Sequence, residues 1–196
     1  HNYIRYMKNQ IFLISLFLIS CMKESIINIS IETSHGIIDV ELYQNKAPIT
    51  VSNFLKYIDE ERYDDFHFYR VVHAGNQAEN DIKIEVIQGG LGFNEHPMEL
   101  APIQHETTTK TGLNHLDGTI SMARLTPGTA SSEIFICINN QPELNFGGKR
   151  NPDGQGFAAF GKVINGMDII RNIQKMPENK QMLDKIIPVL SIKRKK

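Results

Sequence analysis

Residues 118–138 read GTISMARLTPGTASSEIFICI, and two strand candidates lie in this stretch, Thr119 to Ala123 and Ile134 to Ile138. The second candidate is a short apolar run and the first alternates polar with apolar residues, and glycines lie around both, which is typical of turns. Short apolar runs bounded by turn residues indicate buried strands, whereas helices need longer periodic segments. The stretch therefore predicts a fold built from short strands.

Further strand candidates lie on both sides of this stretch. Residues Ile27 to Ile31 and Ile38 to Leu42 alternate apolar and polar side chains around the turn signal Ser34-His35-Gly36, which predicts a β-hairpin. The other candidates are Phe66 to Val72, Val86 to Gln88, Phe157 to Val163 and the closing strand Pro188 to Ile192.

Only two segments have helical character. Pro48 opens the first, where its missing N–H costs nothing, and Val51, Phe54, Leu55 and Ile58 follow at the spacing of an apolar helix face. The second is shorter, Met167 to Ile173, after Asn165-Gly166. Many short strands with glycine-rich turns and two helices predict a mainly β fold, a closed antiparallel barrel.

Composition places the chain among ordinary globular domains. It has 196 residues, 41% of them hydrophobic and 22% charged, which predicts one domain with a short appendage. A net charge of −1 gives no global field that would attract nucleic acid, and we expect no such partner. The two cysteines, Cys21 and Cys137, do not make a disulfide framework, although a bond between them stays open.

The N-terminal residues have the pattern of an export signal. Residues 11–20 read IFLISLFLIS, too short to span a bilayer but suited to the apolar region of a signal peptide, with Lys8 before it. Met7 is a candidate start, so residues 1–6 are a tag, another non-native remnant or an upstream extension. Leu18-Ile19-Ser20-Cys21 resembles the lipobox of bacterial lipoproteins, which implies cleavage before Cys21 and lipidation of its thiol. An ordinary signal peptide with a chance cysteine stays the alternative.

These patterns predict three parts: a signal peptide and lipobox over residues 1–21, a short tether over 22–28, and the globular domain over 29–196. The lipid on Cys21 would hold the domain to a bacterial membrane. We therefore expect an extracytoplasmic protein, on the periplasmic side.

Six motifs, in the same order, resemble the cyclophilin family of peptidyl-prolyl cis-trans isomerases over about Ile29 to Ile192. They are Ala47 to Phe54, Phe68 to Val72, Val86 to Gly90, Gly118 to Ala123, Ser131 to Ile136 and Phe160 to Met167. The resemblance implies a closed eight-stranded antiparallel barrel capped by two helices, and isomerisation of X–Pro bonds in secreted or periplasmic proteins during folding.

The resemblance also implies the residues of the site. Arg70 would donate a hydrogen bond at the twisted amide, Gln88 would orient Arg70 and bind the substrate backbone, and Phe135 would floor the proline slot. The residues implied for substrate binding are Val86, Met122, Ala123, Arg124, Glu133, Leu144 and Phe157. The reaction needs no cofactor and no metal, and no histidine pair has the spacing of a zinc site.

The chain departs from the family pattern at four places. Glu85 stands where a phenylalanine is usual, Glu133 stands where glutamine is common, and Phe157 replaces a histidine of eukaryotic members. The segment His73 to Ile84 is longer than the usual link and polar, which predicts a surface loop. The carboxylate of Glu133 would be able to pair with Arg70 or Arg124.

Two other functions stay open. Glu85 and Glu133 favour a catalytically weak, cyclophilin-like chaperone or peptide-binding module, and a structural lipoprotein without a peptide cleft is the third reading. For the isomerase and for the peptide-binding module alike, the expected partners are proline-containing polypeptides. We expect a monomer.

Overall fold

Eight antiparallel strands close into a barrel in the computed structural model of the chain, which describes residues 25–195. With the short strand β8, which lies outside the barrel, the sheet has nine strands: β1 (Ile26–Thr33), β2 (Gly36–Tyr43), β3 (His67–Val72), β4 (Val86–Gly90), β5 (Thr119–Met122), β6 (Ile134–Cys137), β7 (Ala158–Asn165), β8 (Glu178–Asn179) and β9 (Met182–Arg194). The helices are α1 (Pro48–Asp59), α2 (Thr108–Thr111) and α3 (Met167–Gln174), and short 3-10 turns occupy Ala74–Asn76 and Pro142–Leu144.

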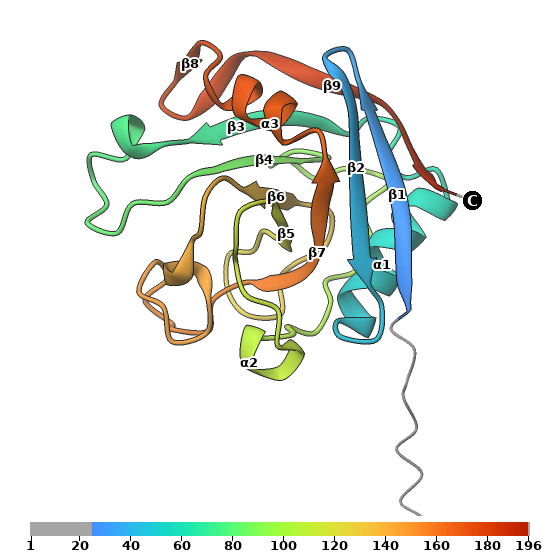
Figure 1. Cartoon of the computed structure of the whole chain (residues 1–196), viewed down its shortest axis with the longest axis horizontal. Coiled ribbons are helices and arrows are strands. Elements are labelled where there is room, and N and C mark those ends of the chain that lie inside the picture. Colours follow the sequence, from blue (N-terminus) through green and yellow to red (C-terminus); the bar gives the residue numbers. More distant parts are fainter. Residues whose placement is uncertain (1–24, 196) are drawn as a thin grey trace, which may run out of the picture.

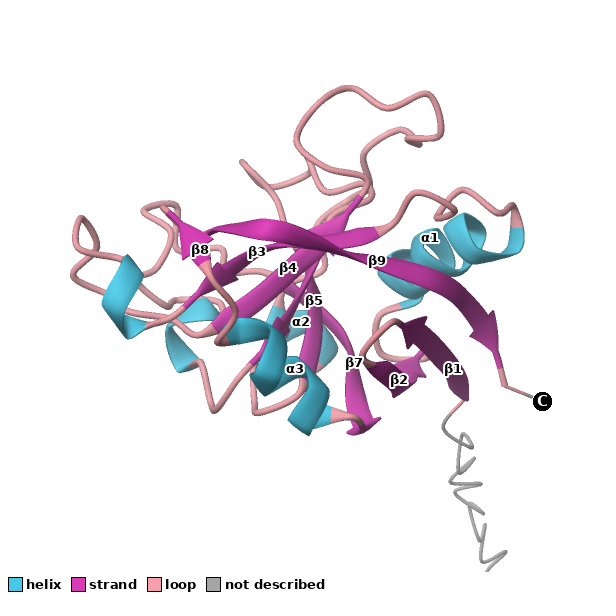
Figure 2. Cartoon of the chain, turned by 90° about the horizontal axis from the view of Figure 1, so that it is seen from above, coloured by secondary structure: helices cyan, strands magenta, loops and turns pink. Residues whose placement is uncertain are grey.

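The strand order is β1-β2-β7-β5-β6-β4-β3-β9, and the pairing of β1 with β9 closes the barrel (Figure 1). The two-residue strand β8 pairs only with β9, as the outer arm of a hairpin. Helices α1 and α3 lie at opposite ends of the barrel (Figures 1 and 2). The predicted eight-stranded antiparallel barrel with two capping helices is confirmed.

The β1–β2 hairpin is confirmed, with Thr33 opposite Gly36 across a two-residue turn. Gly36 has a φ of +127°, and a Cβ there would lie 2.7 Å from the Cδ1 atom of Ile169 on α3, so the turn needs glycine. β1 begins at Ile26, one residue before the predicted strand, so the last three residues of the predicted tether, 26–28, belong to the barrel. The reason is that β2 extends to Tyr43 and pairs with Ile26.

Helix α1 buries Val51, Phe54 and Leu55 against the barrel, as its spacing predicted. Its first residues have no local side-chain cap. The buried carboxylate of Glu106 takes this role: it accepts hydrogen bonds from the backbone N–H groups of Ile49 (3.3 Å) and Thr50 (2.8 Å) and from the Thr50 hydroxyl (2.7 Å). The long segment between β4 and β5 is thereby tied to the helix.

Two apolar clusters divide the molecule. The large one fills the barrel and continues under α1 and α3, with Phe54, Phe68 and Phe160 fully buried in it. The second lies on the outer face of β4 and β6; its members are Val72, Ile84, Val86, Phe135, Cys137 and Leu144, with Ala123 and Phe157 packed against it. Because side chains fill the barrel, a ligand site has to lie outside it.

Some element boundaries differ from the sequence prediction. β9 begins at Met182 rather than Pro188. The sequence prediction missed the first half of the strand because this half is largely exposed and has no apolar run. The loop over residues 73–84 is organised around Gln77, which is almost fully buried and bonds its side-chain amide to the backbone of His73 and Ile84. The loop therefore has a fixed shape against the second cluster.

Residues 1–24, and with them the predicted signal peptide and Cys21, lie outside the described residues. Among residues 25–195, none of the helices has the length and apolar character needed to cross a membrane. Cys137 is a free, buried thiol, and burial raises its pKa.

Candidate active site

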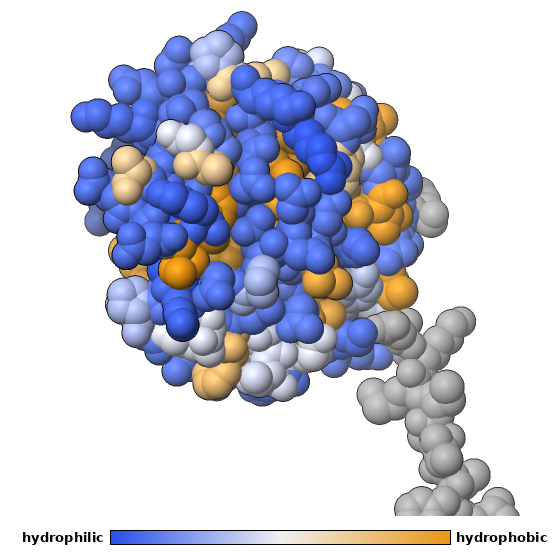
Figure 3. All heavy atoms as spheres, turned by 60° about the vertical axis from the view of Figure 1, so that its left-hand side comes forward, coloured by the Kyte–Doolittle hydropathy of each residue, from blue (hydrophilic) through white to orange (hydrophobic). Residues whose placement is uncertain are grey.

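A cleft of about 460 Å³ lies over the second apolar cluster, on the outer face of β3, β4 and β6. Phe135, Val86, Ile84, Leu144 and Phe157 form its apolar wall. Its border contains charged and polar side chains, among them Arg70, Gln88 and Glu133. Figure 3 brings the left-hand side of Figure 1 forward and shows apolar patches set among hydrophilic residues. The cleft therefore offers an apolar surface with a polar border.

The floor of the cleft is held rigidly from behind. The ring of Phe135 stacks on the fully buried ring of His115, with centroids 5.9 Å apart, and meets the ring of Phe157 edge-on at 5.2 Å. His115 contacts the Asn145 amide oxygen through Nδ1 (2.8 Å) and the Ser121 hydroxyl through Nε2 (2.9 Å). Burial lowers the pKa of His115 to about 4, so the ring is neutral at pH 7.

Arg70 reaches the cleft because of a bulge in β3. The pairing of β3 with β4 shifts between Phe68 and Arg70, where one extra residue sets Arg70 directly opposite Gln88. Directly opposite residues of an antiparallel pair point to the same face, so both side chains border the cleft. Burial lowers the pKa of the Arg70 guanidinium, which nonetheless keeps its charge at neutral pH.

Two glutamine side chains hold the Arg70 guanidinium. Its Nη1 donates to Oε1 of Gln88 (2.7 Å), while Nε (3.0 Å) and Nη2 (2.6 Å) both donate to Oε1 of Gln181, in the turn between β8 and β9. An arginine has five N–H groups, and these bonds use three of them. One N–H on each terminal nitrogen is thus without a partner in the described part of the chain.

A chain of hydrogen bonds continues from Gln88 to the border of the cleft. Gln88 Nε2 donates to the Tyr69 hydroxyl (2.8 Å), which donates to Oε2 of Glu133. The other oxygen of Glu133 accepts from the backbone N–H of Gly92 (2.9 Å) and from the Ser132 hydroxyl (3.1 Å). Burial and the nearby carboxylate raise the pKa of Tyr69, which keeps the hydroxyl protonated as a donor.

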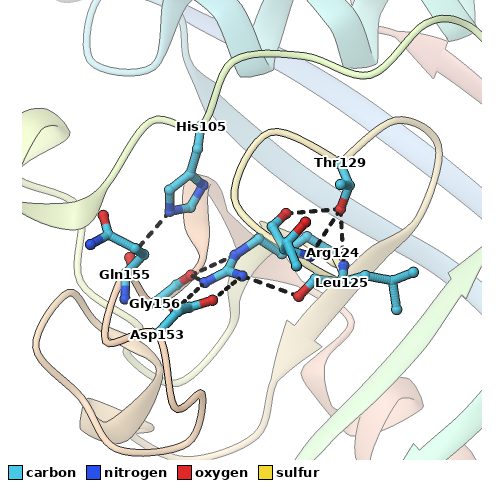
Figure 4. A network of polar contacts seen from close by, with 8 residues as sticks. His105, Arg124, Leu125, Thr129, Asp153, Gln155 and Gly156 are labelled. Atoms are coloured by element: carbon cyan, nitrogen blue, oxygen red, sulfur yellow. Dashed lines mark hydrogen bonds and ion pairs between the residues drawn. The ribbon is translucent and has the colours of Figure 1, made fainter.

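These contacts correct the pairing suggested for Glu133. Its carboxylate contacts neither Arg70 nor Arg124 among the described residues, because Tyr69 and Gly92 hold it at the other end of the network. Arg124 binds Asp153 through two N–H···O bonds (2.7 and 2.9 Å) and the carbonyl of Gly156 (Figure 4). Hydrogen bonds from Arg124 hold the pKa of Asp153 at about 2.

The Arg124 guanidinium also lies 5.1 Å from the centre of the Phe157 ring. Its side chain is buried, which fixes the loop over residues 146–156 against the cleft. The backbone N–H of Ala123 donates to the Glu133 carbonyl (2.8 Å), so that group is engaged within the protein.

Of the residues implied by the resemblance, the structure gathers nine around the cleft: Arg70, Val86, Gln88, Ala123, Arg124, Glu133, Phe135, Leu144 and Phe157. Met122 is placed elsewhere. It is 1% exposed, lies opposite Ile134 in the β5–β6 pair and packs in the barrel core. Its side chain therefore faces away from the cleft, and the expectation that it binds the substrate is wrong.

Glu85 is also outside the cleft. Its carboxylate accepts a hydrogen bond from the Asn139 side chain (2.8 Å), while Ile84 and Val86 line the cleft. Strand alternation puts residues 84, 86 and 88 on one face and residue 85 on the other. Ile84 thus supplies an apolar surface that the sequence analysis did not predict. An apolar residue at the end of a polar loop would have indicated a buried position there.

The sequence reading missed three further groups. Gln181 and Tyr69 hold the Arg70–Gln88 pair, and Arg150 borders the cleft while bonding Gln77 (2.9 Å) and the carbonyl of Ile82 (2.5 Å). Tyr69 is adjacent to Arg70 in a matched motif, so its position was visible. Gln181 lies 111 residues from Arg70, and no local pattern links the two.

Comparison with known proteins agrees with this geometry. Residues 28–194 match the model of the family described as cyclophilin type peptidyl-prolyl cis-trans isomerase/CLD. The chain is 35% identical to a peptidyl-prolyl cis-trans isomerase of Acinetobacter baylyi over 169 residues, which cover 84% of this chain and 81% of that protein. It is 32% identical to peptidyl-prolyl cis-trans isomerase B of Escherichia coli, over 82% of this chain and 92% of that protein.

A crystal structure of a cyclophilin-type isomerase from Cryptosporidium parvum has the same fold, with a TM-score of 0.68 and 21% identity over 88% of this chain and 99% of that one. A second crystal structure of that protein was determined in the presence of the dipeptide Ala-Pro. The family match and the two bacterial relatives each span most of the chain, so this protein belongs to the cyclophilin-type peptidyl-prolyl cis-trans isomerases.

Proposed function

We propose that the cleft isomerises X–Pro bonds of secreted or periplasmic proteins during their folding, with Arg70, Gln88 and Phe135 as its catalytic residues. The observation that carries the proposal is the Arg70 guanidinium, held by Gln88 and Gln181 at the border of an apolar cleft, with two N–H groups that have no partner among residues 25–195.

The reaction requires only that the twisted amide is bound better than the planar one. Rotation about the peptide bond has a barrier of about 18–20 kcal/mol, because twisting breaks amide resonance. In the twisted state the prolyl nitrogen becomes pyramidal and accepts a hydrogen bond. Arg70 would donate that bond, in a cleft that excludes much of the water, and the interaction would be stronger in the transition state than in the ground state.

The other lining residues would position the peptide. The proline ring would rest on Phe135, between Val86, Leu144 and Phe157. The slot is fixed because Phe135 stacks on His115 and contacts Phe157, and the Phe157 ring in turn lies against Arg124. The main chain of Ala123 and Arg124 would border an extended substrate. Glu133 would act at the edge of the cleft, with its carboxylate already bonded to Tyr69 and Gly92.

The weakly catalytic binding module loses one of its two supports. Glu85 faces away from the cleft, and Ile84 gives that wall the apolar character expected of an isomerase. Of the two glutamates, Glu133 alone still supports the binding module, because it borders the cleft.

The experiment that tests the proposed roles is catalysed cis-to-trans isomerisation of a short X–Pro peptide by the full chain in detergent, beside Arg70→Ala. We expect acceleration by the parent and a loss of at least about tenfold in the variant, which equals about 1.4 kcal/mol of transition-state stabilisation. Leu190→Ala, at an exposed position on β9 that does not line the cleft, is the control and should keep the parent rate within about twofold. An Arg70→Ala variant that is folded and equally fast would refute the role of Arg70.

We also propose that the protein is lipid-anchored through Cys21 on the periplasmic side of a bacterial membrane. The support is the sequence alone: an apolar run of ten residues ending in Leu18-Ile19-Ser20-Cys21, with β1 beginning soon afterwards at Ile26. Metabolic labelling with radioactive palmitate in a bacterial host should label the parent and not Cys21→Ser. Equal labelling of both would contradict the proposal.

A further inference from the structure

The turn between β8 and β9 has an unusual backbone. Asn179 pairs with Met182 across a two-residue turn, Lys180-Gln181, and both turn residues have positive φ, +50° and +75°. Hairpin turns with two left-handed residues favour Asn-Gly, because glycine has no Cβ to strain. Gln181 therefore occupies a position where a glycine would be easier to accommodate.

Each polar group of Gln181 is engaged. The backbone N–H donates to Oε2 of Glu178 (2.5 Å), and the carbonyl accepts from the N–H of Val71 (2.8 Å). The side-chain Nε2 donates to the carbonyl of Asn76 (2.9 Å), which fixes the amide so that Oε1 faces Arg70. The turn is thus fastened to β3 and to the loop after it, and presents a single acceptor to the guanidinium.

That acceptor holds a different edge of the guanidinium from Gln88. Gln181 takes the Nε and Nη2 donors, whereas Gln88 takes Nη1. Two edges fixed at once define the plane of the group, while Gln88 alone would leave Arg70 free to rotate about its side-chain torsions. Fixed donors cost no reorganisation when the transition state forms.

We propose that Gln181 is a positioning residue of the isomerase, which orients the Arg70 guanidinium from the β8–β9 turn. The inference rests on the role proposed for Arg70. It adds a residue to the working site from outside the cleft lining, in a turn whose outer arm, β8, the barrel does not need for closure. The strained turn is then explained by the side chain it has to present.

The test compares Gln181→Gly with Lys180→Gly. Glycine suits the positive φ of both positions, which offsets part of the cost of the side-chain hydrogen bonds lost in Gln181→Gly, so both variants should stay folded in thermal unfolding. Gln181→Gly should lower kcat by about tenfold and leave KM within about twofold, the loss expected for one hydrogen bond to a charged group. Lys180→Gly should keep the parent values. A Gln181→Gly variant with the parent kcat would overturn the proposal.

Two further measurements separate positioning from turn stability and from the proposed function itself. Gln181→Met keeps the length of the side chain without the acceptor, and should lose as much kcat as Gln181→Gly; full activity would overturn the proposal. NMR of the Arg70 Nε–H should show a slowly exchanging proton in the parent that exchanges fast in Gln181→Met. If the proton is protected in the parent and exchanges fast in Gln181→Met, but Arg70→Ala keeps the parent rate, the contact stands and the role proposed for Arg70 is wrong. If the proton is unprotected in the parent, the contact itself is overturned.

Discussion

Strands β4 and β6 have one face in the barrel and one in the cleft, and the two faces are built differently. Ile87 and Ile136 point into the core and belong to its large apolar cluster. On the other face, Gln88 takes part in directed hydrogen bonds and Phe135 packs against two rings, those of His115 and Phe157. The core tolerates any arrangement that fills its volume, whereas the cleft depends on particular donors and acceptors. Changes in the core should therefore act on stability, and changes in the cleft on rate.

The largest effect should come from emptying the core. Phe54 is fully buried and its ring packs at 5.4 Å from Tyr63 and 5.3 Å from Phe160. Phe54→Ala should lower the free energy of unfolding by about 3–5 kcal/mol, through lost burial and a residual cavity. Urea unfolding measures the loss. At low temperature, where the variant is still folded, its kcat should match the parent.

A large fall in kcat of folded Phe54→Ala, with a small change in stability, would break the distinction between the two faces. The matched control is Leu125→Ala, since Leu125 is 88% exposed and its removal should change stability by less than about 0.5 kcal/mol.

The second prediction concerns His115, which backs the cleft floor. Burial lowers its pKa in the folded protein to about 4, below the ordinary value of 6.5. The unfolded chain therefore binds the proton more readily, so stability falls as pH drops below 6.5 and the loss is complete below about pH 4. A difference of this size corresponds to about 3 kcal/mol.

Urea unfolding at pH 7, 6, 5 and 4 checks the His115 prediction. The comparison is His115→Asn, which cannot be protonated in this range and should show a flatter dependence between pH 6.5 and 4. Acidic groups such as Asp153, with a pKa of about 2, lose their contribution only at lower pH. Identical slopes in the two proteins would show that His115 is not the cause.

The sequence was a good guide to whatever is periodic and local. Alternation in residues 27–42 predicts the β1–β2 hairpin, and the helical spacing after Pro48 predicts α1. Met122 was misplaced because the resemblance assigned the whole motif to the pocket, whereas only one face of β5 is turned that way; all four residues of the strand are buried, and Met122 shares the core face with Ile120. The bulge that turns Arg70 toward Gln88 leaves no compositional trace.

Gln181 shows the same limit most clearly. A polar residue in a tight turn predicts a solvated loop, and only the fold brings it to Arg70, 111 positions away. The core follows from pattern because burial is an average over many contacts. The cleft does not, because its polar contacts join single atoms from distant parts of the chain.

The smallest effect should come from Tyr69, which connects the two ends of the cleft network without lining the cleft. Tyr69→Phe keeps the ring, which packs against Phe93 at 4.9 Å, and removes only the hydroxyl. Gln88 then loses an acceptor and Glu133 a donor, so Gln88 is held only through its bond to Arg70. We expect kcat/KM to fall about fivefold, close to 1 kcal/mol, with a stability loss of similar size.

Tyr43→Phe, which removes a hydroxyl bonded to Glu41 on β2, should leave kcat/KM unchanged. If both variants keep the parent rate, Gln88 and Gln181 orient Arg70 without help, and the working network ends at Gln88; a fall confined to Tyr69→Phe extends it to Glu133.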